Sequence, residues 1–355
     1  MTKEILIVGG YGHVGQEVAR RVARMQGMEN RLVVAGRRLE HARRFADELG
    51  AGTRAIRIDV DAPPPPEVLE RTGVVVMCVD SSDERLAEQC LRAGIGWVDV
   101  TAEERRLERL EALGPLARRH GSAAVLSVGV CPGTTNLLAA HARGELGPLR
   151  RVDLFLMLGA GDAHGQAAIE WTLENLGAAF AYREEGAWAM ARGFGARAPV
   201  RIPGEARDRW GYRFNFPDQR VIARTLAIPS VSTWLLFDHR ALTLGAALVA
   251  RTGASRLLGS PRARRVAARA FGRLRFGSDA CVVVACAESV GGERRSFALA
   301  GRREASLTGH VAAEVVRDVV AGRAPAGVHH LGEIAQPAEF LQRLPGDTTG
   351  VRLWL

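Results

Sequence analysis

The first strand-like run of the chain leads directly into a glycine-rich turn, and this junction constrains the fold more than any other feature. Residues 5–8 are consecutive apolar residues, the pattern of a strand buried on both faces. Gly10, Gly12 and Gly15 follow as G-x-G-x-x-G, and a helical pattern begins within the motif. The first glycine permits a tight turn, the second lets a pyrophosphate approach the backbone, and the third lets the helix pack on the strand. We therefore predict a dinucleotide site formed by Gly10, Tyr11, Gly12, His13, Val14 and Gly15.

Strand-like and helix-like segments alternate over the first 130 residues. This alternation is typical of a doubly wound parallel sheet with helices on both faces. Together with the glycine motif it predicts an α/β fold, with a Rossmann dinucleotide-binding domain over residues 1–133. The expected strands are 5–8, 31–35, 55–58, 74–78, 97–100 and 123–128, and the expected helices are 14–25, 40–49, 84–93 and 103–120.

After Gly133 the pattern changes to a mixture of strands and helices. We expect an α+β domain over residues 134–305, built on an open sheet with one covered face. Residues 306–355 are expected to pack back on the first domain. The expected strands of this region are 151–158, 186–191, 199–202, 231–237, 281–288 and 296–300.

Charge and composition narrow the classes of partner. The formal net charge is +9, but the arginines are spread among 39 acidic residues, so we expect neither a nucleic-acid nor a membrane partner. The five cysteines form no C-x-x-C and have no zinc spacing, which predicts no metal site, and their odd number and low density favour a reducing cytoplasm. The longest apolar helical stretch, residues 241–250, is too short to cross a bilayer. Residues 262–275 form a basic amphipathic helix that suits a membrane surface or a lid, and we favour a solvated face.

The end of the second strand selects the cofactor. Arg37 and Arg38 stand where an acidic residue would bind the ribose 2′-hydroxyl of NAD. Guanidinium groups suit a 2′-phosphate instead, so we predict NADP(H). Asp59, after the third strand, is expected either near the adenine or as a turn residue. Asp80 and Ser81 follow the fourth strand, where they would meet the cofactor or serve the turn.

Two further strand ends carry candidates for the substrate side. Asp99 and Thr101 share a face at the end of the fifth strand. Asp99 would bind a substrate amine or relay a proton, or else it is a buried carboxylate that caps the next helix. Cys131 follows the sixth strand as a possible nucleophile, although we favour a packed thiol beside the site. The remaining substrate candidates are Thr101, Pro132, Gly133 and Asn136.

Taken together, these motifs resemble the saccharopine dehydrogenase (reductase-type) family. The resemblance implies a Rossmann domain completed by the C-terminal segment, and an inserted substrate domain that mediates dimerisation, hence a homodimer. It also implies NADPH-linked chemistry at a C–N bond of a small molecule, as in an imine reductase or an amine dehydrogenase. Asp99 and Cys131 match positions that border the family's substrate pocket, although many members have Asp in place of Cys131. The matching segments are 9–15, 35–37, 90–94, 97–101, 129–133, 136–139, 308–310 and 324–329.

Two other functions remain open. One is an NADPH-dependent reductase of C=C or C=O bonds, although the chain has no Tyr-x-x-x-Lys pair and Lys3 is its only lysine. The other is a non-catalytic NADP-binding sensor, because a fold does not determine a function.

Overall fold

The structure is a computed structural model that describes residues 3–50, 52–271, 277–344 and 351–355. Its internal contacts divide the chain into two compact units. The N-terminal unit comprises residues 1–133 and 305–336, and the second unit comprises residues 134–304 and 337–355.

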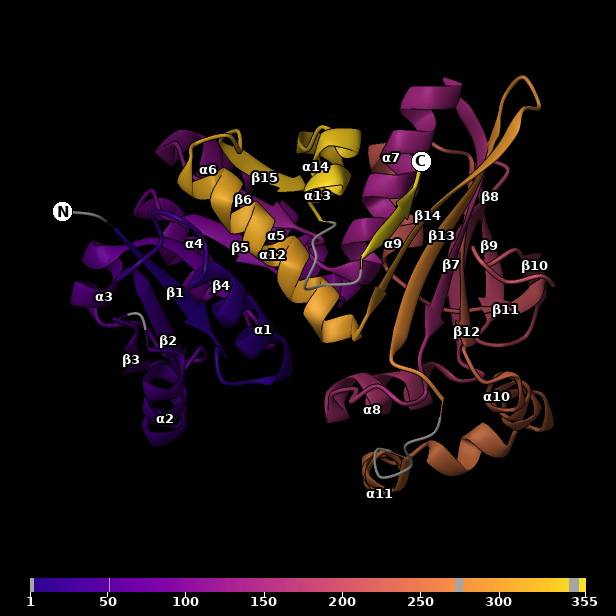
Figure 1. Cartoon of the computed structure of the whole chain (residues 1–355), viewed down its shortest axis with the longest axis horizontal. Coiled ribbons are helices and arrows are strands. Elements are labelled where there is room, and N and C mark those ends of the chain that lie inside the picture. Colours follow the sequence, from indigo (N-terminus) through magenta and orange to yellow (C-terminus); the bar gives the residue numbers. More distant parts are fainter. Residues whose placement is uncertain (1–2, 51, 272–276, 345–350) are drawn as a thin grey trace. The chain divides into compact units, whose positions relative to one another are not determined.

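The N-terminal unit is a parallel sheet flanked by helices (Figure 1). Its described strands lie in the order β15-β6-β5-β4-β1-β2-β3, and all neighbouring pairs are parallel. The chain moves outward from β1 in both directions, so the crevice at the carboxyl end of β1 is a topological switch point, where open α/β sheets bind ligands. The strands are Glu4–Val8 (β1), Leu32–Gly36 (β2), Arg54–Arg57 (β3), Thr72–Met77 (β4), Gly96–Asp99 (β5), Ala123–Leu126 (β6) and Gly327–His330 (β15).

The helices of this unit pack tightly against the sheet and against one another. A Cβ atom added at Gly309 on α12 would lie 2.7 Å from the Cβ of Glu17 on α1, so the two helices are in close contact at this glycine. This contact joins the late segment 305–336 to the first helix of the chain. The helices are His13–Val22 (α1), Leu39–Leu49 (α2), Pro66–Arg71 (α3), Arg85–Arg92 (α4), Glu104–Glu111 (α5), Gly114–His120 (α6), Glu304–Val320 (α12) and Leu331–Ile334 (α13).

The second unit is a mixed sheet of nine strands among the described residues. Its main path is β10-β11-β12-β7-β13-β14-β16, and a hairpin of β8 and β9 joins it through β12. The strands are Leu149–Leu158 (β7), Ala179–Glu184 (β8), Ala187–Arg192 (β9), Arg197–Val200 (β10), Arg209–Arg213 (β11), Ser230–Phe237 (β12), Ala280–Ser289 (β13), Arg294–Arg302 (β14) and Arg352–Trp354 (β16). The accompanying helices are Thr135–Leu146 (α7), Gln166–Asn175 (α8), Asp218–Thr225 (α9), Arg240–Thr252 (α10), Ala254–Leu258 (η2), Pro261–Phe271 (α11) and Pro337–Arg343 (α14).

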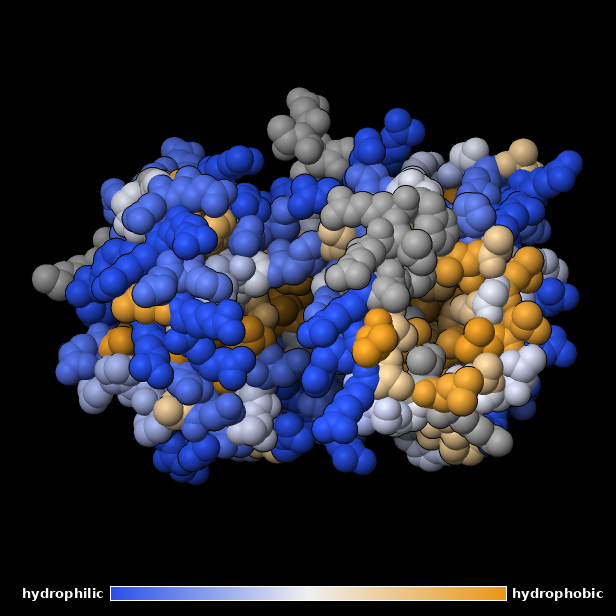
Figure 2. Space-filling model, turned by 90° about the horizontal axis from the view of Figure 1, so that it is seen from below, coloured by the Kyte–Doolittle hydropathy of each residue, from blue (hydrophilic) through white to orange (hydrophobic). Residues whose placement is uncertain are grey.

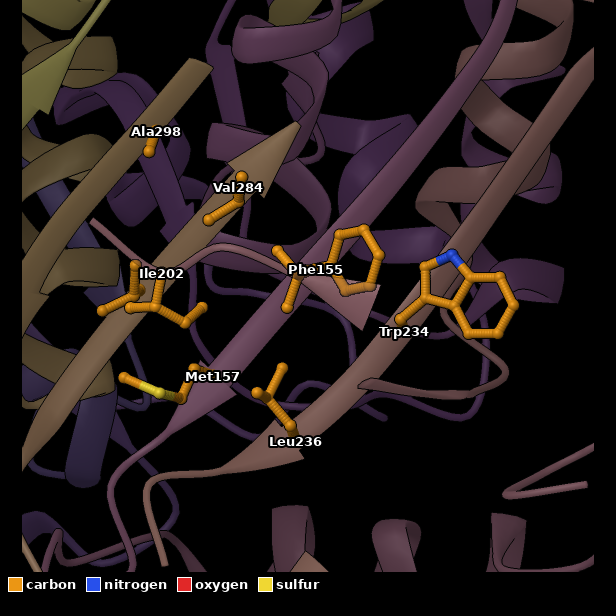
Figure 3. Close-up of a cluster of buried hydrophobic side chains, with 9 residues drawn as sticks. Phe155, Met157, Ile202, Trp234, Leu236, Val284 and Ala298 are labelled. Atoms are coloured by element: carbon orange, nitrogen blue, oxygen red, sulfur yellow. The ribbon is translucent and has the colours of Figure 1, made fainter. Parts of the chain in front are cut away.

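Both faces of the second sheet bury apolar side chains. On one face α7 packs on β13 and β14, where His141 meets Phe297 edge-on. On the other face Phe155 and Trp234 stack within a buried cluster shown in Figure 3. Ile202, just beyond the edge strand β10, packs into this cluster, so part of the sheet's own edge covers that face. The sequence pattern predicts only one covered face, which is wrong, because residues beyond the edge strand β10 cover the second face.

The end of the chain also differs from the sequence-based expectation, which placed all of residues 306–355 on the first domain. Only residues 305–336 complete the N-terminal unit, through α12 and β15. Residues 337–355 belong to the second unit, where α14 contacts α7 and β16 pairs with β14. The physical reason is that β14 has an open edge whose backbone groups need partners, and β16 provides them. Among the described helices, none combines the length and the apolarity that a bilayer crossing requires.

Candidate cofactor and substrate site

The glycine-rich turn has the shape that the motif predicts, with one shift. The residue with left-handed backbone is Gly9 (φ +77°), one position before the motif begins. The backbone N–H of Gly9 and that of Gly10 both donate to the carbonyl of Ala35, over 2.8 and 3.2 Å. A Cβ atom at Gly15 would lie 2.2 Å from the Gly9 oxygen, so this helix position requires glycine. The turn is therefore held against β2 by its own backbone.

Helix α1 begins directly behind the turn, at His13. Its N-cap is Gly12, which has no side chain to occupy the free N–H groups, and its first turn contains no acidic residue. The positive end of the helix dipole is therefore available to an anion. His13 is exposed and Val14 is half-buried, so the predicted residues 10–15 form one continuous loop and helix start.

Tyr11 connects the turn to the end of β2. Its ring lies against Gly36, where an added Cβ atom would be only 2.5 Å from the ring. The Tyr11 hydroxyl accepts a hydrogen bond from the backbone N–H of Arg38 over 3.1 Å, and the ring meets His41 edge-on. Sequence reasoning includes Tyr11 only as a motif position. The glycine at position 36, directly before the arginine pair, is the signal for this close approach.

Three guanidinium groups belong to the carboxyl edge of β2 and β3. Arg37 and Arg38 are exposed, and neither guanidinium makes a hydrogen bond or ion pair with any residue that the structure describes. Arg57 is the register partner of Gly36 on β3 and is likewise exposed. Paired residues of parallel strands point to the same face, so the Arg57 side chain leaves the sheet on the side where Tyr11 covers Gly36. Sequence reasoning does not identify Arg57, because the β2–β3 register is not visible in the chain.

The loops after β3 and β4 are tied together by an aspartate that sequence reasoning also overlooks. Asp61 accepts hydrogen bonds from the backbone N–H and the hydroxyl of Ser82, over 3.1 and 2.6 Å. These bonds lower the pKa of Asp61. The Asp59 carboxylate accepts a hydrogen bond from the backbone N–H of Asp61 over 3.3 Å. Of the two roles predicted for Asp59, near the adenine or in a turn, this contact matches the turn. Asp80 is exposed at the end of β4 and makes no hydrogen bond with the described residues.

Asp99 is placed differently from the substrate-facing role expected of it. The side chain is 1% exposed, and its oxygens accept hydrogen bonds from the Thr101 N–H (2.8 Å), the Trp97 indole (3.1 Å) and the Arg106 guanidinium (3.3 Å). Burial raises the pKa of Asp99, and the Arg106 charge opposes this shift. Arg106 is equally buried and also donates to the Ser81 hydroxyl. The pair therefore anchors the loop after β4, which matches the buried-carboxylate alternative.

Two other polar residues at these strand ends also serve local structure. The Thr101 hydroxyl accepts the N–H of Glu103 at 3.3 Å, next to the start of α5. Ser81 and Glu84 have the spacing of a capping box, but Ser81 donates to the carbonyl of Asp83 over 2.7 Å. Helix α4 begins at Arg85 with no side-chain cap. Ser81 is therefore held by Arg106 and by its own turn.

The loop after β6 is supported by a buried hydrogen-bonded chain. Ser127, which has a left-handed backbone (φ +56°), meets Nδ1 of His330 at 2.7 Å. Nε2 of His330 meets Glu111 at 2.8 Å, and the imidazole is almost fully buried. A Cβ atom at Gly133 would lie 2.9 Å from the Ser127 oxygen, so the loop folds back on its own start. The returning strand β15 thus fixes the loop that contains Cys131.

The remaining predicted residues lie in or after this loop. Cys131 is half-buried and Pro132 is buried. Asn136 is 2% exposed in the first turn of α7, which belongs to the second unit. Among the residues that the structure describes, no group of His, Cys, Asp and Glu side chains is arranged to hold a metal ion.

Comparisons with known proteins agree with this geometry. Residues 5–125 match the family model described as saccharopine dehydrogenase NADP binding domain. Among solved structures, the chain is similar to apo saccharopine dehydrogenase (L-Glu forming) from Saccharomyces cerevisiae, with 16% identity, 99% of this chain and 100% of that chain covered, and a TM-score of 0.67. It also matches a meso-dapdh mutant from Clostridium tetani E88 (12% identity, 97% and 96% covered, TM-score 0.48) and a myo-inositol dehydrogenase from Corynebacterium glutamicum (13%, 91% and 90%, TM-score 0.44). No curated protein matches the chain.

The family match and the glycine turn define the chain as an NAD(P)H-dependent oxidoreductase. More narrowly, residues 5–125 match a saccharopine dehydrogenase NADP-binding domain, and the cofactor is NADP(H). The likeness to the yeast enzyme shows that the whole chain shares that enzyme's fold. The exposed guanidiniums of Arg37 and Arg38, directly after Gly36, fit the extra phosphate of this cofactor.

Proposed function

We propose that this oxidoreductase acts on a C–N bond of a small molecule, either reducing an imine or oxidising the corresponding amine. NADPH, when bound, supplies a hydride to the imine carbon. The resemblance to saccharopine dehydrogenases supports this chemistry. The observation that favours it over ketone reduction is that the described loops after β4, β5 and β6 contain neither tyrosine nor lysine as a proton donor.

A carbonyl that accepts a hydride becomes an alkoxide and needs a proton donor, which reductases commonly supply from tyrosine or lysine. The only lysine, Lys3, lies at the opposite end of β1, where it donates to the carbonyl of Glu70 over 2.6 Å. Of the three tyrosines, Tyr11 packs on the end of β2, and the other two belong to the second unit. No tyrosine or lysine therefore lies in the described loops after β4, β5 and β6. A protonated imine needs no such donor, because hydride addition gives a neutral amine.

Different residues of the chain would bind the cofactor and line the substrate site. The turn from Gly9 to Gly15 would receive the pyrophosphate, and Arg37, Arg38 and Arg57 would surround the 2′-phosphate. Asp80 would accept a ribose hydroxyl. The loop that contains Cys131 would form the substrate wall at the end of β6, together with the candidates Thr101, Pro132, Gly133 and Asn136. We retain the homodimer and the cytoplasmic location as parts of this proposal.

The test of the reaction is NADPH consumption with pairs of amines and carbonyl compounds, measured against each carbonyl compound and each enoyl ester alone. Turnover that requires the amine supports the proposal. Turnover with a carbonyl compound or an enoyl ester alone favours the C=O or C=C alternative. Binding of NADPH with no turnover on any pair favours the sensor.

The cofactor assignment has its own test, which needs no substrate. The double variant Arg37→Gln/Arg38→Gln should lower the preference for NADPH over NADH by tenfold or more, because two bidentate donors to the phosphate are lost. Calorimetry measures both affinities. The matched control is Arg43→Gln/Arg44→Gln, which removes the same charge from exposed positions of helix α2 and should leave the preference within about twofold.

A further inference from the structure

A basic and apolar segment of the second unit is not used by the proposed function. No aspartate or glutamate occurs between Asp238 and Asp279, whereas arginines recur throughout this stretch. The segment contains α10, η2 and α11. Residues 112–144 also lack acidic residues but contain only three arginines, whereas residues 239–278 contain nine, so this segment is unusually basic for the chain.

Large apolar side chains of this segment face solvent. Leu244 and Leu248 lie one helical turn apart on α10 and are 56% and 63% exposed. Leu257 on η2 is 81% exposed, and Val266 on α11 is 67% exposed. Figure 2 shows a hydrophobic area on this face of the second unit, at the right of the view. Isolated exposed leucines need no explanation, but a contiguous group of them marks an interaction surface.

Unpaired arginines accompany these apolar side chains. Arg262, Arg265 and Arg269 follow one another along a single stripe of α11, and all three are exposed. None of them makes a hydrogen bond or ion pair with a residue that the structure describes. Arg264, which points inward, pairs with Glu174 at 3.3 Å instead. Arg240 and Arg251, on α10, are also exposed.

The segment packs on the rest of the second unit. Helix α11 packs on α8, η2 contacts α8, α10 and α11, and α10 packs on β12. Ala247 on α10 and Ala268 on α11 are buried on the inner sides of their helices. Thr243 accepts the backbone N–H of Phe237 at the end of β12 over 2.9 Å. The apolar and basic side chains are therefore displayed by helices whose opposite faces are already packed.

We propose that this surface, made by α10, η2 and α11, docks on an anionic lipid bilayer. Leucine and valine side chains would enter the interface between headgroups and acyl chains, while the arginine stripe would meet lipid phosphates. Helix α10 has 13 residues, so at 1.5 Å per residue it is too short to cross the membrane and would lie along it. This proposal departs from the solvated face expected from the sequence, and it is independent of the proposed reaction.

Charge favours a bilayer over the other possible occupants. In a two-fold contact with a second copy, the surface would meet itself, and unpaired arginines would face arginines with no acidic residue of the segment to offset them. A nucleic acid would satisfy the arginines, but it offers no apolar layer for Leu244, Leu248 and Leu257. A bilayer with anionic headgroups is negatively charged at its surface and apolar at shallow depth, so it matches both features.

The experiment is co-sedimentation of the full chain with vesicles of phosphatidylcholine alone and of phosphatidylcholine mixed with phosphatidylglycerol. Binding is expected only with the anionic vesicles, and it should weaken as salt is added. The triple variant Arg262→Gln/Arg265→Gln/Arg269→Gln should weaken binding by about two orders of magnitude, at roughly fivefold per arginine. The double variant Leu244→Ser/Leu248→Ser should also weaken it, without any change in charge.

The matched control is Arg105→Gln/Arg119→Gln/Arg207→Gln, which removes the same charge from exposed positions outside the segment and should bind as the wild type does. The lack of anionic vesicle binding, or equal loss in both triple variants, overturns the proposal. So does a homodimer that the leucine variant alone dissociates, in the absence of vesicle binding. Binding of an RNA homopolymer that only the arginine variant weakens, again without vesicle binding, would assign the surface to nucleic acid.

Discussion

The two units differ in how their sheets place polar residues. In the N-terminal unit the strands run in parallel, so the loops that follow them gather at one edge of the sheet and leave guanidinium groups unpaired there. In the second unit the strands run in both directions, and several charged residues pair with charged residues on the same sheet. Arg151, for example, bridges Asp153 at 2.7 Å and Glu184 at 2.9 Å. Function in the first unit thus depends on backbone turns, and the second unit depends on side-chain packing.

The largest effect should come from the core of the second unit. Phe155→Ala removes a 2% exposed ring that stacks on Trp234, and it should lower the free energy of unfolding by about 4 kcal/mol. Because the glycine turn belongs to the other unit, the affinity for NADPH measured by calorimetry should stay unchanged. Met190→Ala, at a 70% exposed position, should change stability by under about 0.5 kcal/mol. A parallel loss of NADPH affinity in Phe155→Ala would show that the units do not behave separately.

A slightly smaller effect is expected from the buried ion pair of the N-terminal unit. Arg106→Met leaves Asp99 buried without its counter-charge and should lower the free energy of unfolding by about 3 kcal/mol, measured by urea titration. The double variant Arg106→Met/Asp99→Leu should recover part of this loss, because no buried charge remains.

The control for that variant is Arg92→Met, which breaks the exposed pair between Arg92 and Glu88 on α4. Such a pair contributes about 0.5 kcal/mol or less. If Arg106→Met cost no more than Arg92→Met, then Asp99 would not depend on Arg106.

The sequence predicts the parallel sheet well, because its signals are local. Four apolar residues before a glycine turn, and a glycine before two arginines, are readable along the chain. The ion pair between Asp99 and Arg106 cannot be predicted from the sequence. Arg106 lies on the following helix, and its guanidinium donates to both Asp99 and Ser81. The sequence does not predict a binding role for Arg57 either, because its position beside Gly36 depends on the register of β2 and β3.

The second unit is less readable because its pairings are distant. Strand β7 pairs with β12 and β13, which lie far along the chain. The short strand β16 at the chain terminus is recognisable only once the open edge of β14 is known. Hydrophobic periodicity therefore finds strands in this unit without showing how they pair.

Cofactor binding should depend strongly on the shape of the glycine turn. Gly15→Ala places a Cβ atom 2.2 Å from the Gly9 oxygen, so the turn must distort, and NADPH affinity should fall about 100-fold in calorimetry. Gly144→Ala is the matched change in α7 of the second unit, where nothing lies within 4 Å of the added atom. It should keep the affinity and raise stability by about 0.5 kcal/mol. Equal NADPH affinity in the two variants would show that the glycine turn does not bind the cofactor.

The smallest effect concerns acid, and it should distinguish the units. Burial, together with the charges of Arg21 and Arg317, lowers the pKa of His310 on α12 to about 4. The unfolded chain protonates this side chain near pH 6.5, so between these values the unfolded state binds more protons and stability falls as the pH falls. His310→Asn should therefore lose about 1 kcal/mol less stability than the wild type between pH 7 and pH 4.5, after allowance for solvent screening.

Hydrogen exchange can locate this acid effect when protection, corrected for the intrinsic exchange rate, is compared at pH 7 and at pH 5. Between these pH values protection of β5 in the N-terminal unit should fall less in the variant than in the wild type, while the change in protection of β13 in the second unit should be the same in both proteins. His120→Asn, at an exposed position of α6, should change neither. If the substitution changed the acid response of protection equally in β5 and β13, acid would destabilise both units together. The two units would then not unfold separately.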